Sequence, residues 1–166
     1  GYDKVQSELC KKLEIEGIHI NYYEGEEHIS QCIKESVNND VFVIYTPAVA
    51  SDNPELSYFI NKGCKMHKRA EVLAMISKQS FTIAVAGTHG KTTTSTVLAH
   101  ILQQAGKEPT AFLGGISKNY KTNLLFAKEE NILIVEADEY DRSFLQLHAD
   151  IAIITSADAD HLDIYE

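Results

Sequence analysis

The sequence predicts an α/β fold with mostly parallel sheets. Short apolar runs rich in β-branched residues alternate along the chain with segments of helical periodicity, as in strands joined by crossover helices. The runs lack the polar–apolar alternation of a half-exposed sheet, which indicates strands buried on both faces. They are VFVIY at 41–45, FTIAVAG at 81–87, ILIVEAD at 132–138 and DIAIITS at 150–156.

The segments between these runs predict the remaining elements. Residues 15–23 alternate as a further strand would. Asn53 and Pro54 suit the cap and first turn of a helix. Helices are expected over 4–13, 27–37, 54–61, 69–77 and 90–105. One unit closes and a new strand opens near residues 78–80, so we predict two domains, 1–79 and 80–166.

Composition excludes several classes of protein. The net charge is −9, which disfavours nucleic acid as a partner because phosphate backbones are bound by clustered cations. The three cysteines are widely spaced and lack a CxxC pair, which favours free thiols in a reducing cytoplasm. No stretch reaches the ~18 apolar residues of a membrane span. We therefore expect a cytoplasmic protein without membrane or nucleic-acid partners; composition does not indicate the oligomeric state.

The segment AVAGTHGKTTT at 84–94 joins a predicted strand to a predicted helix, where a phosphate-binding loop belongs. In such a loop Lys91 would reach the β- and γ-phosphates of a nucleotide, and the Thr92 hydroxyl would hold Mg²⁺. The generic motif has a glycine five residues before Gly90, but Val85 stands there. A glycine-rich turn that binds nothing is the alternative, and the flanking strand and helix favour the nucleotide site.

Two acidic segments follow the later strands. Glu136, Asp138, Glu139 and Asp141 gather where one buried strand ends, the edge at which open α/β sheets bind ligands. Mg²⁺ would relieve their repulsion, although a solvated acidic loop is an equally good reading of these residues alone. His161 lies in DADHLDIY after the next strand, and by itself it is better explained as a structural residue.

The loop AGTHGKTTT resembles the ATP loop of the Mur ligase family, which reads GTxGKT/S without the leading glycine. The resemblance extends over essentially the whole chain. It includes VIYTPAVASDNPEL at 43–56, RAEVLA at 69–74, the glycine pair at 114–115 and the DADHLD segment. It implies an incomplete Rossmann-like UDP-sugar-binding domain followed by an incomplete P-loop ATPase domain with a mostly parallel sheet.

The same resemblance implies roles for individual residues. ATP would be bound by the loop residues Gly87, Thr88, His89, Gly90, Lys91, Thr92 and Thr93. Thr92, Glu136 and His161 would bind metal, and Lys91, Glu136 and His161 would be catalytic. Because imidazole is an unusual ligand for Mg²⁺, the His161 contact could run through water or to Mn²⁺. Candidates for UDP-sugar contacts are Thr46, Ala48, Val49, Asp138 and Ser143.

The activity implied is an ATP-dependent ligation in cytoplasmic peptidoglycan precursor synthesis. ATP would phosphorylate the lactyl carboxylate of UDP-N-acetylmuramate, and the amine of L-alanine would attack the acyl phosphate. A ligase that joins a preformed tripeptide to the same sugar nucleotide in cell-wall recycling is the alternative enzyme. A folylpolyglutamate synthase-type ligase is more distant, and a non-catalytic P-loop nucleotide-binding module is an alternative of another class.

Both ends of the sequence suggest a piece of a longer protein. The chain opens without a preceding strand and stops just after the DADHLD segment. We expect this piece alone to be inactive, because the domains that would close over the substrates are missing.

Overall fold

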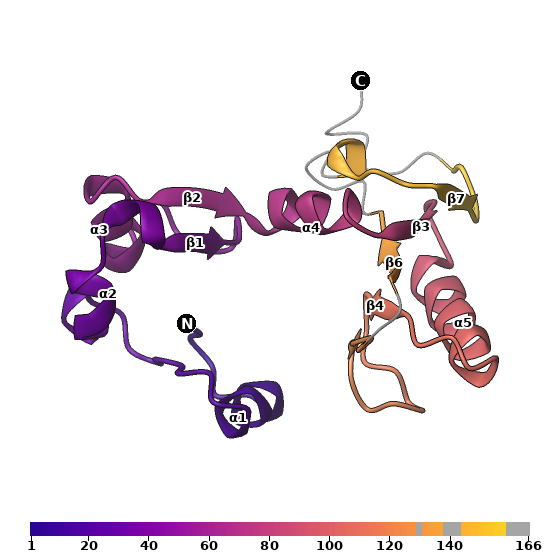
Figure 1. Ribbon diagram of the computed structural model, residues 1–166, viewed down its shortest axis with the longest axis horizontal. Helices are drawn as coiled ribbons and strands as arrows, with labels where there is room; N and C mark the ends of the chain where they lie inside the picture. Colours follow the sequence, from indigo (N-terminus) through magenta and orange to yellow (C-terminus); the bar gives the residue numbers. More distant parts are fainter. Residues whose placement is uncertain (129–130, 138–143, 159–166) are drawn as a thin grey trace. The chain divides into compact units, whose positions relative to one another are not determined.

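The computed structural model describes residues 1–128, 131–137 and 144–158 (Figure 1). The chain divides into two compact units, Gly1–Arg69 and Ala70–Glu166. The domain limits of 1–79 and 80–166 that the sequence predicts remain a prediction. No helix in the described ranges is both long enough and apolar enough to span a bilayer.

The first unit is built on a two-stranded parallel sheet of β1 (Phe42–Tyr45) and β2 (Lys65–Lys68). The crossover between the strands contains α3 (Pro54–Asn61). The Asn53 side chain accepts a hydrogen bond from the Leu56 N–H at 3.0 Å and caps this helix, as predicted. The unit also contains α1 (Glu8–Ile15), α2 (Gln31–Glu35) and the short 3₁₀ turns η1 (Glu26–His28) and η2 (Asn38–Asp40).

Three expectations for the first unit were wrong. Residues 15–23 form no strand; only one isolated bridge joins Asn21 to Tyr2. A strand needs a partner for its backbone groups, and Ile15 is 86% exposed in spite of its place in the apolar pattern. In place of the helix expected over 27–37, the structure has the two short elements η1 and α2. The helix expected over 4–13 runs instead over Glu8–Ile15, because the Ser7 side chain caps it by accepting a hydrogen bond from the Cys10 N–H.

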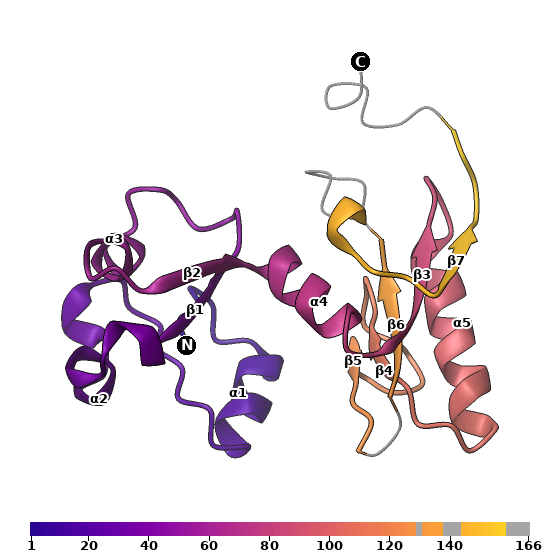
Figure 2. The same ribbon diagram turned by 45° about the horizontal axis from the view of Figure 1, so that its top comes forward.

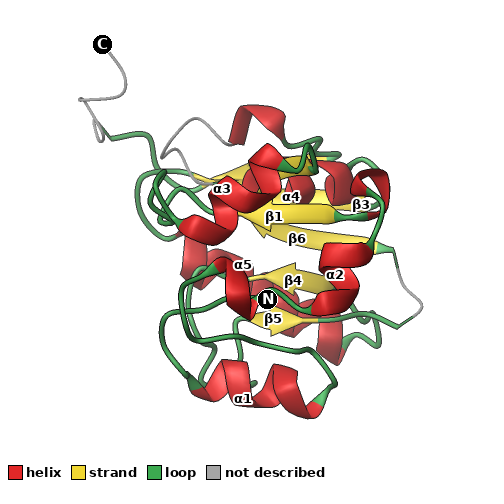
Figure 3. Cartoon of the chain, turned by 90° about the vertical axis from the view of Figure 1, so that its left-hand side faces the viewer, coloured by secondary structure: helices red, strands yellow, loops and turns green. Residues whose placement is uncertain are grey.

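The second unit is a five-stranded sheet with the order β5–β4–β6–β3–β7. All neighbours are parallel except β4 and β5, which form an antiparallel pair. Figure 3 shows β5, β4, β6 and β3 as successive strands. The strands are β3 (Phe81–Ala86), β4 (Thr110–Phe112), β5 (Leu124–Leu125), β6 (Ile132–Glu136) and β7 (Ile151–Ile154), and the helices are α4 (Arg69–Ser77) and α5 (Lys91–Gln104).

Helices and a loop cover both faces of this sheet. Figure 2 shows α5 beside the strands of this sheet. On the face that it covers, Ala99 of α5 packs against Ala111 and Ile134. On the other face, Leu73 of α4 packs on Ala84, Val135 and Ala137 together with Phe144 and Leu147. The central strands β3 and β6 are therefore buried on both faces, as their continuous apolar runs predicted.

The sequence did not reveal β2, β4 or β5. Lys65–Lys68 reads KMHK and carries no apolar run, while β4 and β5 are three and two residues long. Each becomes a strand because a neighbouring backbone pairs with it: Phe42 with Lys65, Ala111 with Ile134 and Phe112 with Leu124. Such pairing is a property of the folded chain and leaves little trace in a short segment.

Candidate nucleotide and metal site

The candidate site lies at the carboxyl edge of the second unit's sheet. The phosphate loop follows β3, Glu136 is the last residue of β6, and residues 155–158 follow β7. β3 lies between β6 and β7, so these three strand ends are neighbours. Open α/β sheets bind ligands at this edge.

Two glycines shape the loop. Gly87 has φ +124° and Gly90 has φ +84°, conformations that L side chains rarely adopt. A Cβ at Gly87 would also lie 2.3 Å from Thr155 Oγ1 and 2.8 Å from the backbone of Ser156. Val85, at the position of the missing leading glycine, is fully buried inside β3, and its carbonyl accepts from Ala137 N–H at 2.9 Å. A position inside a strand does not need the conformational freedom of glycine, so valine fits there.

The end of β7 holds the loop in place. The Ser156 carbonyl accepts a hydrogen bond from the Thr88 N–H at 3.2 Å. The Ser156 hydroxyl accepts another from the His89 N–H at 2.9 Å. The Thr88 hydroxyl donates to the Asp158 carbonyl and accepts from the Asp158 N–H, each at 3.0 Å. The loop conformation is therefore set from a segment about 65–70 residues further along the chain.

Lys91 and Thr92 open α5 directly after the loop. The Lys91 ammonium donates to the Gly87 carbonyl at 2.7 Å, so its charge lies against the loop itself. Thr92 and Thr93 are exposed at the helix N-terminus, where backbone N–H groups and the helix dipole favour an anion. The loop can thus present backbone donors, one ammonium and hydroxyl groups to a phosphate chain.

Three hydrogen-bond donors converge on the Glu136 carboxylate. Its Oε2 accepts from the Thr92 hydroxyl at 3.0 Å. Its Oε1 accepts from the Ser95 hydroxyl at 2.8 Å and from the Gly114 N–H at 2.6 Å. Donors of this kind hold a carboxylate in one orientation.

The arrangement fits a small divalent cation. Two neighbouring ligands of an octahedral Mg²⁺ lie about 3 Å apart, because each metal–oxygen distance is about 2.1 Å. Thr92 Oγ1 and Glu136 Oε2 have this separation. A Cβ at Gly114 would come within 2.4 Å of Oε2 and 2.8 Å of Thr92 Oγ1, so glycine keeps the space beside both oxygens clear.

Among the residues that the structure describes, few protein ligands are available for such a cation. Within the described ranges, no three His, Cys, Asp or Glu side chains gather as a metal cluster. One carboxylate and one hydroxyl suit Mg²⁺, which is commonly held by one or two protein groups together with substrate phosphates and water.

The structure brings together part of the predicted site. Lys91, Thr92 and Glu136 lie at one sheet edge, with Gly87, Thr88, His89, Gly90 and Thr93 in the adjoining loop and helix start. Thr46, Ala48 and Val49 follow the carboxyl end of β1 in the first unit, where Val49 N–H donates to the Thr46 carbonyl at 3.1 Å. His161, Asp138 and Ser143 lie outside the described residues.

Sequence reasoning missed four residues that shape this site: Ser95, Gly114, Thr155 and Ser156. Ser95 could have been found from its spacing, since residues three apart on a helix share a face and Thr92 was already a candidate. Gly114 was noted only as half of a glycine pair. Nothing local marks Thr155 or Ser156, whose contacts to the loop depend on the pairing of β7 with β3.

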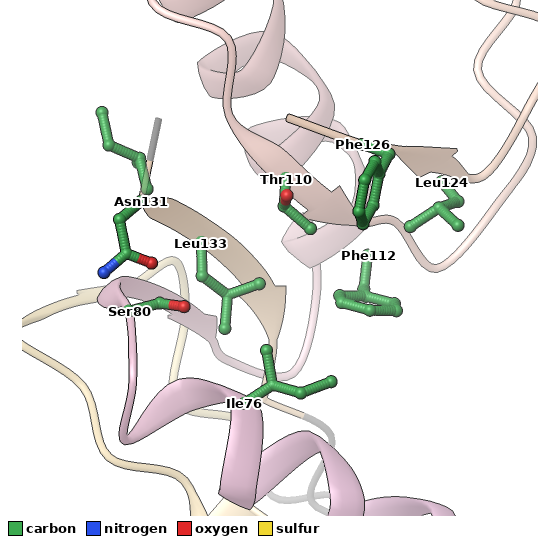
Figure 4. Close-up of a pocket in the computed structure, with 9 residues that line it drawn as sticks. Ile76, Ser80, Thr110, Phe112, Leu124, Phe126, Asn131 and Leu133 are labelled. Atoms are coloured by element: carbon green, nitrogen blue, oxygen red, sulfur yellow. The ribbon is translucent and has the colours of Figure 1, made fainter. Parts of the chain in front are cut away.

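A separate apolar pocket of about 230 Å³ lies elsewhere in the second unit (Figure 4). Ile76, Leu133 and Phe126 line it together with the residues at the amino ends of β4 and β6. Parallel sheets bind their ligands at the opposite, carboxyl edge. We therefore do not assign the nucleotide to this pocket.

The mostly parallel sheet, covered on both faces, and the loop between β3 and α5 define the class: an α/β protein of the P-loop type. Two family models match successive parts of the chain. The Mur ligase family catalytic domain matches residues 1–81, and the Mur ligase middle domain matches residues 85–166. The chain belongs to the Mur ligase family.

Named relatives and solved structures agree with this family. The chain is 51% identical over 165 residues to a UDP-N-acetylmuramate–L-alanine ligase of Flavobacterium johnsoniae and 47% identical over 168 residues to one of Cytophaga hutchinsonii. Each comparison covers 99% of this chain but 36% of the relative, so the chain spans about a third of the length of these relatives.

Two solved structures share the fold. A UDP-N-acetylmuramate–alanine ligase of Thermotoga maritima matches with a TM-score of 0.81 and 31% identity, over 99% of this chain and 37% of that one. The UDP-N-acetylmuramate:L-alanyl-γ-D-glutamyl-meso-diaminopimelate ligase of Neisseria meningitides matches with a TM-score of 0.78 and 23% identity, over 100% and 55%. The second likeness shows the fold alone.

Proposed function

We propose that the full-length protein carrying this chain is an ATP-dependent ligase that joins L-alanine to the lactyl carboxylate of UDP-N-acetylmuramate. The reaction proceeds through an acyl phosphate and supplies a cytoplasmic precursor of peptidoglycan. The observation that carries the chemistry is the pairing of Thr92 and Glu136 beside the phosphate loop. The choice of substrates is supported by relatives of that name about 50% identical over 99% of the chain.

The residues at the sheet edge suit phosphoryl transfer to a carboxylate. A carboxylate and ATP are both anions, so their approach builds up negative charge that must be neutralised. Lys91 contributes one positive charge at the loop, and backbone N–H groups at the start of α5 contribute further donors. Thr92 and Glu136 would hold a Mg²⁺ ion, with Mn²⁺ as a substitute, and the ion would supply positive charge to the phosphates.

The remaining predicted residues complete the proposal. His161 would contribute to a second metal position. Thr46, Ala48 and Val49 would contact the UDP portion of the sugar nucleotide from the carboxyl end of β1, the edge at which parallel sheets bind ligands. Asp138 and Ser143 are the candidates from the second unit.

The test is phosphate release by the full-length protein supplied with ATP, Mg²⁺ and UDP-N-acetylmuramate. L-alanine, L-alanyl-γ-D-glutamyl-meso-diaminopimelate or no amine is then added. We expect release that requires both the sugar nucleotide and L-alanine, with the amide product identified by mass spectrometry.

Other results would replace this function. Release that responds to the tripeptide and not to L-alanine would assign the protein to cell-wall recycling. Nucleotide binding without release, and without affinity for the sugar nucleotide, would leave a non-catalytic P-loop module.

A further inference from the structure

Ser95 is buried at the centre of the candidate site. It lies three residues after Thr92 on α5, so both side chains face β6, where Glu136 ends the strand. Ser95 is fully buried, and its hydroxyl is 2.8 Å from Glu136 Oε1. A hydroxyl buried in this way is costly unless it is hydrogen-bonded, and the nearer of its two acceptors is the charged Glu136 carboxylate.

The two oxygens of Glu136 have different surroundings. Among the described residues, Oε1 receives two donors, the Ser95 hydroxyl and the Gly114 N–H, whereas Oε2 receives one, the Thr92 hydroxyl. A Cβ added at Gly114 would lie 2.4 Å from Oε2. Oε1 is therefore the more firmly anchored oxygen, and Oε2 is the oxygen that lies next to the Thr92 hydroxyl.

We propose that Ser95 is a positioning residue for the divalent cation: it anchors Oε1 so that Oε2 and the Thr92 hydroxyl are presented together as cation ligands. The Gly114 N–H anchors the same oxygen from the β4 side. This inference rests on the proposed function, which supplies the divalent cation that Glu136 would bind. It adds residues that hold the ligand in place without touching the metal themselves.

Thr96 offers a matched control on the same turn. Its hydroxyl donates to the Thr92 carbonyl at 2.6 Å, and the Ser95 hydroxyl is also within 3.1 Å of that carbonyl. Thr96 has no hydrogen bond to Glu136 among those described. Removing the Thr96 hydroxyl therefore tests the effect of a lost contact to Thr92, and removing the Ser95 hydroxyl tests the loss of the carboxylate anchor as well.

The experiment compares Ser95→Ala, Thr96→Ala and the unmodified full-length protein. Mn²⁺ binding is followed by electron paramagnetic resonance in the presence of a non-hydrolysable ATP analogue, nucleotide affinity is measured without divalent cation, and thermal melting reports folding. Second-sphere partners of metal ligands typically contribute 10- to 100-fold to metal affinity. We expect Ser95→Ala to weaken Mn²⁺ binding by about this factor, with cation-free nucleotide affinity unchanged and Thr96→Ala within about twofold of the unmodified protein.

Three results would overturn the inference: unchanged Mn²⁺ affinity in Ser95→Ala, an equal loss in Thr96→Ala, or no Mn²⁺ binding by the unmodified protein. Should Ser95→Ala fail to fold, Ser95→Thr, which keeps the hydroxyl, is measured in its place and is expected to retain Mn²⁺ binding; loss of binding in a folded Ser95→Thr would also count against the anchor. Mn²⁺ binding that depends on Ser95 in a protein without ligase activity would support the anchor and refute only the proposed function.

Discussion

At the scale of single residues, the site depends on a few atoms whose positions are constrained from several sides. Glu136 is oriented by two hydroxyl donors from α5 and by the N–H of Gly114, which lies two residues after β4 ends. Gly87 lies so close to Thr155 and Ser156, just after β7, that a Cβ would not fit there. The Lys91 ammonium donates a hydrogen bond to the Gly87 carbonyl. Changes to these residues should separate effects on chemistry from effects on folding.

Lys91→Ala should abolish turnover of the full-length protein with little change in stability. The ammonium offsets charge on the transferred phosphoryl group, and loss of such a group commonly costs on the order of 10³-fold in rate. Phosphate release and thermal melting measure the two effects. Lys78→Ala removes an exposed lysine of the same unit and should leave turnover unchanged; near-normal turnover of Lys91→Ala would remove Lys91 from the mechanism.

Gly87→Ala should destabilise the protein and disrupt the loop. Its φ of +124° strains any L side chain, and the new Cβ would overlap Thr155 and Ser156. Together these effects should lower the free energy of unfolding by about 3 kcal/mol. Gly106 also has a positive φ, +75°, but a Cβ there meets open space, so Gly106→Ala should cost only about 1 kcal/mol. Urea denaturation of both variants compares the two, and equal losses would show that the contact with β7 is unimportant.

At the scale of elements, local capping and pairing decide where each helix and strand begins. α3 begins where predicted because Asn53 caps it and Pro54 occupies its first turn. α2 follows Ser30, whose side chain makes no capping hydrogen bond, and it extends for only five residues. We therefore expect Asn53 and Ser30, the residues that precede α3 and α2, to contribute differently to stability.

Asn53→Ala should lower the free energy of unfolding of the first unit by about 1 kcal/mol. Asn53 is 8% exposed, and its substitution leaves the Leu56 N–H without the side-chain acceptor that it has now. Ser30→Ala is the matched control and should change stability by less than about 0.5 kcal/mol, since no cap is lost. Urea unfolding followed by far-ultraviolet circular dichroism measures both, and an effect of Ser30→Ala as large as that of Asn53→Ala would contradict the capping argument.

At the scale of the molecule, the sheet of the second unit is covered unevenly. β3 and β6 are buried, whereas the outermost strand β7 leaves Ile151 45% and Ile154 72% exposed. β7 pairs with β3 on one side only within the described part of the chain. An apolar strand with an open edge offers unpaired backbone groups to another chain.

The polypeptide 1–166 studied by itself should therefore associate as its concentration rises. Ile154→Lys should reduce this association, because a charge on an edge strand opposes pairing. Val97→Lys makes the same change at a 51% exposed apolar position on α5 and should have little effect. Multi-angle light scattering across a concentration series measures the mass, and a constant monomer mass for the unmodified polypeptide would contradict the prediction.

Sequence alone determined the α/β class, the central strands and the loop with its lysine and threonine. These features are encoded locally: a strand buried on both faces must be apolar throughout, and a loop that wraps phosphate needs glycines before a helix start. The Mur ligase resemblance followed from the same local motifs, and the family matches confirm it.

Tertiary structure decided what the local pattern could not. The alternation over 15–23 resembles a strand, but no described strand pairs along it, whereas KMHK at 65–68 becomes β2 because β1 lies beside it. Ser95 and Ser156 become part of the site only because α5 packs against β6 and β7 pairs with β3. Hydrogen bonds between segments tens of residues apart depend on how the strands are ordered in the sheet, and that order is fixed only when the chain folds.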